Sequence, residues 1–143
     1  EDVEALRDDL SEPEYRRAKH VVSEIDRTTA AAQAFRDQNW NRVGELMFAS
    51  HESLRDDFQV SCEELDVLVD LAREIGNEGG VIGSRMTGGG FGGCTVTLVK
   101  NQQADRVMKQ LADQYESRTG IKPSCFVSRP ARGAHVLANE VTR

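Results

Sequence analysis

Apolar positions follow two different periods along this chain, and the change of period divides it into two parts. Up to about residue 76, apolar or small residues recur every three or four positions, which is the spacing of one helix face. From about residue 79 this period changes, and short strand-like runs follow; in Cys94–Val99 the two faces alternate along the chain. The pattern therefore predicts a helical part (residues 11–76) followed by a sheet part (residues 79–140) in one α+β domain over residues 1–143.

Three amphipathic helices are expected in the first part. The first begins at a capping box formed by Ser11 and Glu14 and continues for about six turns. Ser61 and Glu64 repeat the capping box before the third helix, and Gly76 is expected to end that helix. The expected apolar faces are Tyr15, Ala18, Val22, Ile25, Thr29, Ala32 and Phe35, then Trp40, Val43, Met47, Ser50 and Leu54, then Leu65, Leu68, Ala72 and Ile75. Because the connectors are short, we expect an antiparallel bundle.

The second part is expected to contain a hairpin, a crossover helix and two further strands in a mainly antiparallel sheet. The expected strands are Val81–Met86, Cys94–Val99, Ser124–Arg129 and His135–Ala138. The expected helix follows the hairpin, with apolar positions at Ala104, Val107, Leu111 and Tyr115 and an end at Gly120.

Composition narrows the functional classes. The net charge of −6 argues against nucleic acid as the main partner, and no apolar run approaches the roughly 20 residues of a membrane span. Cys62, Cys94 and Cys125 are odd in number and lack metal-ligand spacing, which predicts reduced, largely buried thiols in a cytoplasmic protein. The chain opens at Glu1 without an initiator methionine, in a charged helix-prone run, which suggests a domain from the interior of a longer chain.

Five glycines stand among the six residues Gly88–Gly93, which we call the glycine loop. Each glycine costs about 1 kcal/mol relative to alanine in a regular element, so such a run needs positive φ or close backbone approach. Successive exposed N–H groups in such a loop form a nest that suits phosphate. A dinucleotide site is excluded because a strand follows the loop, and no P-loop lysine is present. The spacing alone is equally compatible with a phosphate nest and a simple hairpin loop.

Three residues in and beside the glycine loop could hold the loop or bind an anion. Phe91 is expected to anchor the loop by packing its ring against the core. Arg85 either supplies positive charge beside the loop or is a solvated charge at the end of a strand. Thr87 either donates its hydroxyl to an anion or caps the turn.

Catalytic residue types also occur on the second helix. Ser50, His51 and Asp56 are the residue types of a nucleophilic triad, but adjacent residues of a helix do not face each other. Arg55 stands where a zinc-binding H-E-x-x-H motif requires histidine. We expect Ser50, His51 and Ser53 to lie where the helical part meets the glycine loop, hydrogen-bonding the loop or another domain. The alternative is that His51 is a satisfied interior histidine.

Two acidic clusters are expected to be structural. Asp56 and Asp57 precede Phe58 at a helix end, without a further carboxylate at ligand spacing, so a helix-terminal role is favoured over Mg²⁺ binding. Glu24, Asp26 and Arg27 are expected to form an exposed helix face. No metal site is predicted.

Three segments resemble one known family. Residues 83–98 (GSRMTGGGFGGCTVTL) are similar to the third motif of galactokinases, members of the GHMP kinase superfamily. Residues 46–66 and 17–24 resemble the family's segments upstream of that motif, so the likeness covers the chain from about residue 15 to its end. The resemblance implies a ferredoxin-like C-terminal domain with added helices. Its glycine motif would lie at the interdomain cleft near the transferred phosphate.

The resemblance also implies an activity and its partners. ATP, Mg²⁺ and galactose are the expected ligands, and an N-terminal kinase domain is the expected partner. Thr87, Gly88, Gly89, Gly90, Phe91, Gly92 and Gly93 would form the phosphate region, with Arg85, Ser50 and His51 as possible support. The family's first and second motifs do not occur here, so no catalytic residue is assigned and these residues alone are expected to lack kinase activity. The alternatives are a galactose-sensing regulator, an N-acetylgalactosamine kinase or, without those motifs upstream, a stand-alone ligand-binding module.

Overall fold

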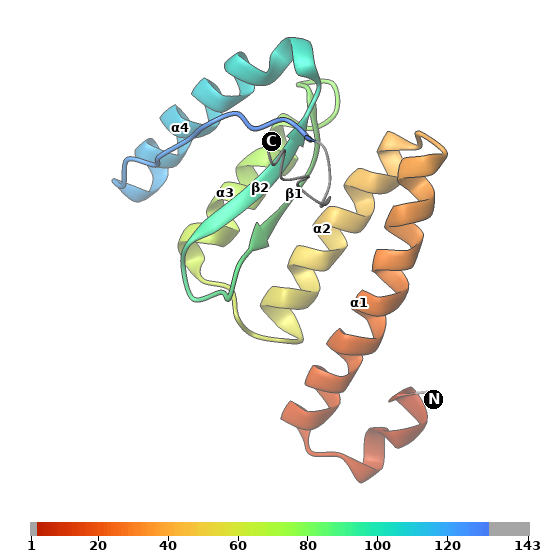
Figure 1. Ribbon diagram of the computed structural model, residues 1–143. Helices are drawn as coiled ribbons and strands as arrows, with labels where there is room; N and C mark the ends of the chain where they lie inside the picture. The colour runs from red at the N-terminus through yellow and green to blue at the C-terminus, as the bar shows by residue number, and fades with distance from the viewer. Residues whose placement is uncertain (1–2, 132–143) are drawn as a thin grey trace, which may run out of the picture.

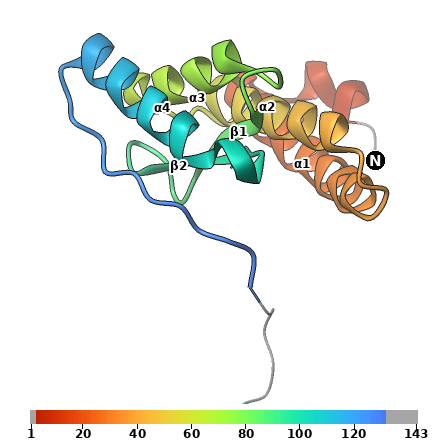
Figure 2. The same ribbon diagram turned by 90° about the horizontal axis from the view of Figure 1, so that it is seen from above.

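The computed structural model describes residues 3–131, in which four helices lie side by side and a β-hairpin lies on one side of them (Figure 1, Figure 2). The elements in chain order are the 3₁₀ helix η1 (Val3–Asp9), α1 (Glu12–Arg36), α2 (Trp40–Asp56), α3 (Glu63–Ile75), β1 (Val81–Thr87), β2 (Cys94–Val99), the 3₁₀ turn η2 (Asn101–Gln103) and α4 (Ala104–Thr119). The predicted α+β order of a helical part, an antiparallel hairpin and a following helix is confirmed.

Local signals place most helix ends correctly. The Ser11 N–H donates to Glu14 Oε2 at 2.9 Å in the expected capping box, and the helix ends at Gly76 and Gly120 both have positive φ. The predicted capping box of Ser61 and Glu64 is wrong. Cys62 is the N-cap of α3, and the Ser61 hydroxyl donates instead to Asp66 Oδ1 at 2.6 Å.

The helices do not form the expected three-helix bundle. α2 lies between α1 and β1, whereas α3 packs mainly on β1 and α4. Because α1 is covered by little besides α2, its predicted apolar face is largely wrong: Val22, Ile25 and Phe35 are exposed, and Ala34 and His20 are buried instead. The core consists of three buried clusters, which are Leu71, Ala72, Val81, Val107, Leu111 and Tyr115, then Ala34, Val43 and Leu46, then Leu54, Leu65 and Met86.

Two glycines allow α2 and β1 to approach closely. A Cβ on Gly44 would collide with the Ile82 carbonyl, 2.9 Å from its carbon, and a Cβ on Gly83 would lie 2.7 Å from the Gly44 Cα. This packing places the C-terminal half of α2 against the end of β1 that leads into the glycine loop.

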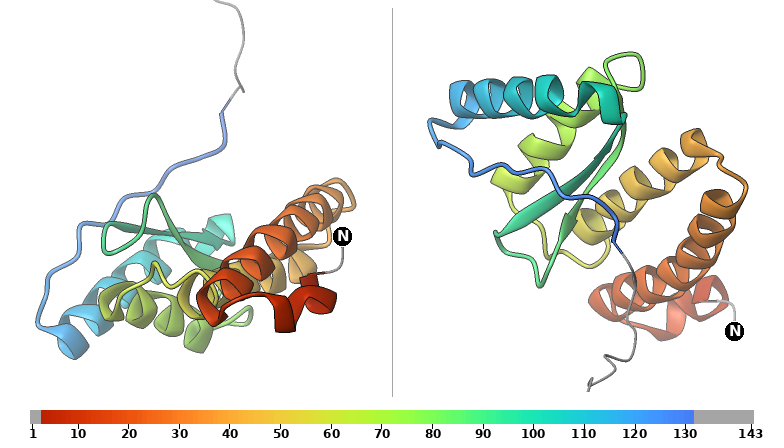
Figure 3. Two further views of the ribbon diagram at one scale, coloured as in Figure 1. Left: turned by 90° about the horizontal axis from the view of Figure 1, so that it is seen from below. Right: turned by 45° about the horizontal axis from the view of Figure 1, so that its top comes forward.

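The described sheet has two antiparallel strands, with Thr87 opposite Cys94 next to the loop. The predicted third strand over Ser124–Arg129 is wrong, since no part of residues 121–131 is in a strand and Phe126 is 82% exposed. Residues 121–131 pass beside the hairpin without joining it (Figure 3), and the sheet in the described residues consists of β1 and β2. The predicted strand His135–Ala138 lies outside the described residues.

The three cysteines are free thiols, as expected. Their expected burial is wrong for Cys94 and Cys125, which are exposed, whereas Cys62 is half-buried.

Candidate functional site: the glycine loop and its supports

The glycine loop joins β1 to β2 and is open on one side. Gly88, Gly90, Gly92 and Gly93 have φ values of 89°, 88°, 118° and 109°, which side chains other than hydrogen rarely allow. A Cβ on Gly88, Gly89, Gly92 or Gly93 would meet nothing within 4 Å. Backbone conformation therefore explains the glycines at positions 88, 92 and 93. A loop of this kind can present backbone N–H groups to an anion.

Phe91 is anchored through its backbone, so the expected anchoring by its ring is wrong. The side chain is 76% exposed, and φ is 60°, an uncommon value for an aromatic residue. The Phe91 N–H donates to the Val60 carbonyl oxygen at 2.6 Å. Gly90 lies directly on Val60, because an added Cβ would be 2.7 Å from the Val60 Cβ. The segment between α2 and α3 therefore supports one side of the glycine loop.

His51 is buried beneath the strand that leads into the loop. Its Nδ1 accepts a hydrogen bond from the Met86 N–H at 3.2 Å, and its Nε2 lies 3.1 Å from Asp66 Oδ1 in a direction poor for a hydrogen bond. Because Nδ1 is an acceptor, the ring is neutral with its proton on Nε2. Burial lowers the pKa of His51, and the Asp66 carboxylate only partly opposes that effect. The side chain thus connects α2, α3 and β1 two residues before Gly88.

Ser50 and Arg85 both meet Glu24 of α1. The Ser50 hydroxyl donates to Glu24 Oε2 at 2.7 Å, and Arg85 Nη1 lies 3.9 Å from the same oxygen. Burial raises the pKa of Glu24, but the Ser50 hydroxyl and Arg27 outweigh burial and hold this pKa below its usual value. Glu24 is therefore half-buried and structural, so its expected place on an exposed face is wrong.

The arrangement separates the candidate triad residues. Ser50 is bonded to Glu24, His51 faces Met86 and Asp66, and Asp56 is paired with Arg55 at 2.8 Å. Asp56 ends α2 and Asp57 is its C-cap, which agrees with a helix-terminal role. Thr87, the last residue of β1, is exposed at the mouth of the loop.

Val60 and Asp66 are supports that the sequence pattern did not reveal. Val60 acts through its backbone carbonyl, which carries no side-chain signal. Asp66 is one of several acidic residues in the first turn of α3, and only the fold brings it to His51.

Within residues 3–131, the alternatives to the glycine loop are a metal site, a membrane-spanning helix and a cavity. No group of three or more His, Cys, Asp or Glu side chains in this part of the chain could hold a metal ion, and none of its helices is long and apolar enough to cross a membrane. A hollow of about 410 Å³ lies between α2, α3 and the start of β1, and no residue of the glycine loop lines it.

Comparison with known proteins identifies the class to which this fold and loop belong. Residues 31–117 match the family model for the C-terminal region of GHMP kinases. The chain belongs to the GHMP kinase family. It is 50% identical to the galactokinase of Bos taurus and 49% identical to that of Homo sapiens, over 137 residues in each case. These alignments cover 96% of this chain and 33% of each relative, so the chain spans about a third of their length.

Solved structures agree with this assignment. The galactokinase of Lactococcus lactis, crystallised with galactose, superposes with a TM-score of 0.78 at 40% identity, covering 84% of this chain and 30% of that one. The mevalonate kinase of L. major, in complex with R-mevalonate, superposes with a TM-score of 0.56 at 27% identity, covering 66% and 28%. The resemblance to galactokinases and the expected GHMP kinase C-terminal fold are therefore confirmed.

Proposed function

We propose that this chain is the C-terminal part of an ATP-dependent galactokinase, which converts galactose and ATP to galactose 1-phosphate. The observation that carries the proposal is the identity of about half of all residues to two galactokinases across 96% of the chain. The galactokinase structure that superposes on 84% of the chain adds support.

In this proposal, Thr87–Gly93 forms one wall of the phosphate region of the active site. Phosphoryl transfer depends on positioning and on dipoles aimed at the developing charge. The positive φ values and the open side of the glycine loop suit backbone N–H groups to that task. ATP would supply the phosphoryl group with Mg²⁺ bound to it. Arg85, Ser50 and His51 would hold the loop's supporting strand.

The remaining parts of the active site would belong to an N-terminal kinase domain. The catalytic residues, the galactose contacts and most of the ATP and Mg²⁺ contacts are assigned there, so this chain alone would be inactive. Val21, Val22 and Ile25 leave an apolar strip of α1 exposed, which such a domain would cover. The cytoplasm, where ATP is available, is the proposed location.

The test is a product assay on the full-length protein and on this chain by itself. With ATP, Mg²⁺ and galactose, the full-length protein should form galactose 1-phosphate, and the chain alone should form none. Galactose binding without turnover would favour the sensing alternative, and faster turnover of N-acetylgalactosamine would favour the kinase for that sugar. Formation of galactose 1-phosphate by the chain alone would contradict the assignment of the catalytic residues to an N-terminal domain.

The role of the loop needs a separate variant. Gly92→Ala places a side chain at a φ of 118° in open space, so it should redirect the loop backbone without a clash. We expect kcat/KM for ATP to fall at least about tenfold. Gly120→Ala is the matched control, because Gly120 also has positive φ and open space but lies at the end of α4. Equal activity of the two variants would contradict a phosphate role for the loop.

A further inference from the structure

The segment between α2 and α3 makes the backbone contact that holds the glycine loop. We call residues 57–62 the connector. Within it, the Val60 N–H donates to the Leu54 carbonyl oxygen at 3.0 Å, and the Val60 carbonyl accepts from the Phe91 N–H at 2.6 Å. Val60 therefore links the end of α2 to the middle of the glycine loop. Within Gly88–Gly93, Phe91 is the residue whose N–H donates to a backbone carbonyl outside the hairpin.

The connector holds a sharp bend that directs this carbonyl. Gln59 has a φ of 60°, a left-handed conformation that costs a residue with a side chain on the order of 1 kcal/mol. The Phe58 N–H donates to the Ser53 carbonyl at 2.9 Å, and the side chains of Phe58 and Val60 pack against Leu54, Leu65 and Met86. A bend of this kind persists only where neighbouring groups hold it in place.

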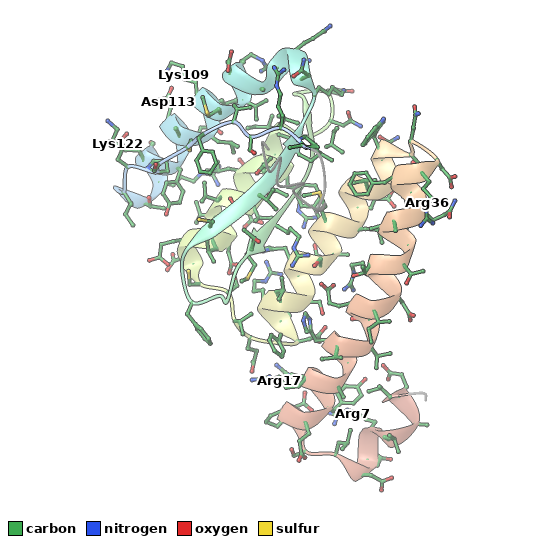
Figure 4. All side chains as sticks on the ribbon, viewed as in Figure 1. Arg7, Arg17, Arg36, Lys109, Asp113 and Lys122 are labelled. Atoms are coloured by element: carbon green, nitrogen blue, oxygen red, sulfur yellow. The ribbon has the colours of Figure 1, made fainter. Side chains whose placement is uncertain are left out.

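Arg17 of α1 holds both sides of the bend. Its Nη1 donates to the Asp57 carbonyl oxygen at 3.1 Å and to Gln59 Oε1 at 3.2 Å, and its guanidinium lies 5.9 Å from the centre of the Phe58 ring. Figure 4 shows Arg17 at the end of α1 where the connector runs, whereas Arg36 lies at the opposite end of the helix. One side chain thus contacts three consecutive residues just before Val60.

We propose that the connector sets the geometry of the glycine loop and that Arg17 is a positioning residue for phosphoryl transfer. The kinetic part of this proposal rests on the proposed function, whereas the structural part does not. Without Arg17, the Asp57 carbonyl and the Gln59 side chain lose their hydrogen bonds from α1, whereas Lys19 and Ser53 still contact the Asp57 carboxylate. The bend at Gln59 is then held less firmly, and the Val60 carbonyl turns away. Phe91 then loses its acceptor, and the loop N–H groups no longer hold one arrangement. Lysine keeps the positive charge and can donate hydrogen bonds, but it lacks the planar guanidinium that lies near the Phe58 ring, so it should replace Arg17 only in part.

The structural test is site-resolved amide hydrogen exchange on the full-length protein. In Arg17→Met, the Phe91 amide should exchange at least about tenfold faster than in the wild type, with the amide of Leu111 in α4 unchanged. Arg17→Lys should give an intermediate rate. Arg36→Met, which removes an exposed arginine from the same helix, should leave Phe91 exchange unchanged. Wild-type exchange at Phe91 in Arg17→Met, or an equal rise at Leu111, would overturn the proposal.

The kinetic test separates positioning from general stability. Arg17→Met should raise KM for ATP or lower kcat by about five- to tenfold, with KM for galactose unchanged, because the loop faces the phosphates. An equal rise of KM for ATP and for galactose would contradict a positioning role. If the wild-type protein lacks kinase activity, the proposed function fails, and amide exchange still decides the structural coupling. If Arg17→Met does not fold, Arg17→Lys decides, and wild-type exchange at Phe91 in that variant would overturn the proposal.

Discussion

His51 accepts a hydrogen bond from the Met86 N–H, with 3.2 Å between Nδ1 and the backbone nitrogen, although the two residues are 35 positions apart. Both side chains are almost completely buried. The Ser61 hydroxyl holds Asp66, which lies beside the other ring nitrogen of His51. A neutral histidine thus joins α2 to the last residues of β1 before the glycine loop.

Removing the acceptor at His51 should destabilise the protein strongly. His51→Leu leaves the buried Met86 N–H without a partner, and we expect the free energy of unfolding to fall by about 2–4 kcal/mol. His51→Asn places a side-chain oxygen near the position of Nδ1 and should cost less. Urea denaturation of both variants measures the difference. Equal losses would show that His51 acts only by filling space.

Stability should decrease with acidification below about pH 6.5, the ordinary pKa of histidine. Burial lowers the pKa of both His51 and His20 in the folded state. The unfolded state therefore binds more protons below pH 6.5, so the free energy of unfolding is highest above that pH and falls as the pH drops. Protonating His51 also turns Nδ1 into a donor that faces the Met86 N–H.

Nearby charged groups also affect the pKa of each histidine. Asp66, Arg55 and Asp70 act on His51, and Glu24, Arg27, Asp57 and Arg85 act on His20. Carboxylates with lowered pKa, such as Glu24 and Asp56, lose their contribution only in more acidic solution. Denaturation at pH 5 to 7.5 should therefore show a slope that is reduced in His51→Asn. An unchanged slope in that variant would exclude His51 as a source of the pH dependence.

Gly44→Ala should have the opposite effect to the one that helix propensity predicts. Alanine stabilises a helix interior by about 1 kcal/mol relative to glycine. At Gly44 the added Cβ would collide with the Ile82 carbonyl and force α2 away from β1, so we expect a net loss of about 3 kcal/mol or more. Chemical denaturation measures whether Gly44→Ala lowers or raises the free energy of unfolding. A rise would contradict the close packing of α2 on β1.

Gln38→Gly should stabilise the turn between α1 and α2. Gln38 has a φ of 54° just after the C-cap Asp37, which is the position where helices favour glycine. We expect a gain of about 0.5–1 kcal/mol. Gln33→Gly, within α1, is the control and should cost about 1 kcal/mol. A loss at position 38 as large as that at position 33 would refute the explanation.

Local chemistry in the sequence determined the elements and the family. Capping at Ser11, the glycine stops at Gly76 and Gly120, and the hairpin around Gly88–Gly93 depend on neighbouring residues, so they could be predicted without a fold. The motif around the glycine loop was also sufficient to indicate the galactokinase resemblance.

Contacts between distant segments were decided only by the tertiary structure. An aromatic residue among glycines predicted that the Phe91 ring anchors the loop. In the structure the Phe91 N–H anchors it instead, by donating to the Val60 carbonyl oxygen. The residues Ser124–Arg129 predicted a strand, but a strand also has to pair with an edge of the sheet, and the local sequence does not show whether that pairing forms. The partners of His51 are likewise set by the close approach of α2 to β1 at Gly44. Periodicity shows which side of an element is apolar, whereas the identity of the surface that covers it depends on how all the elements pack together.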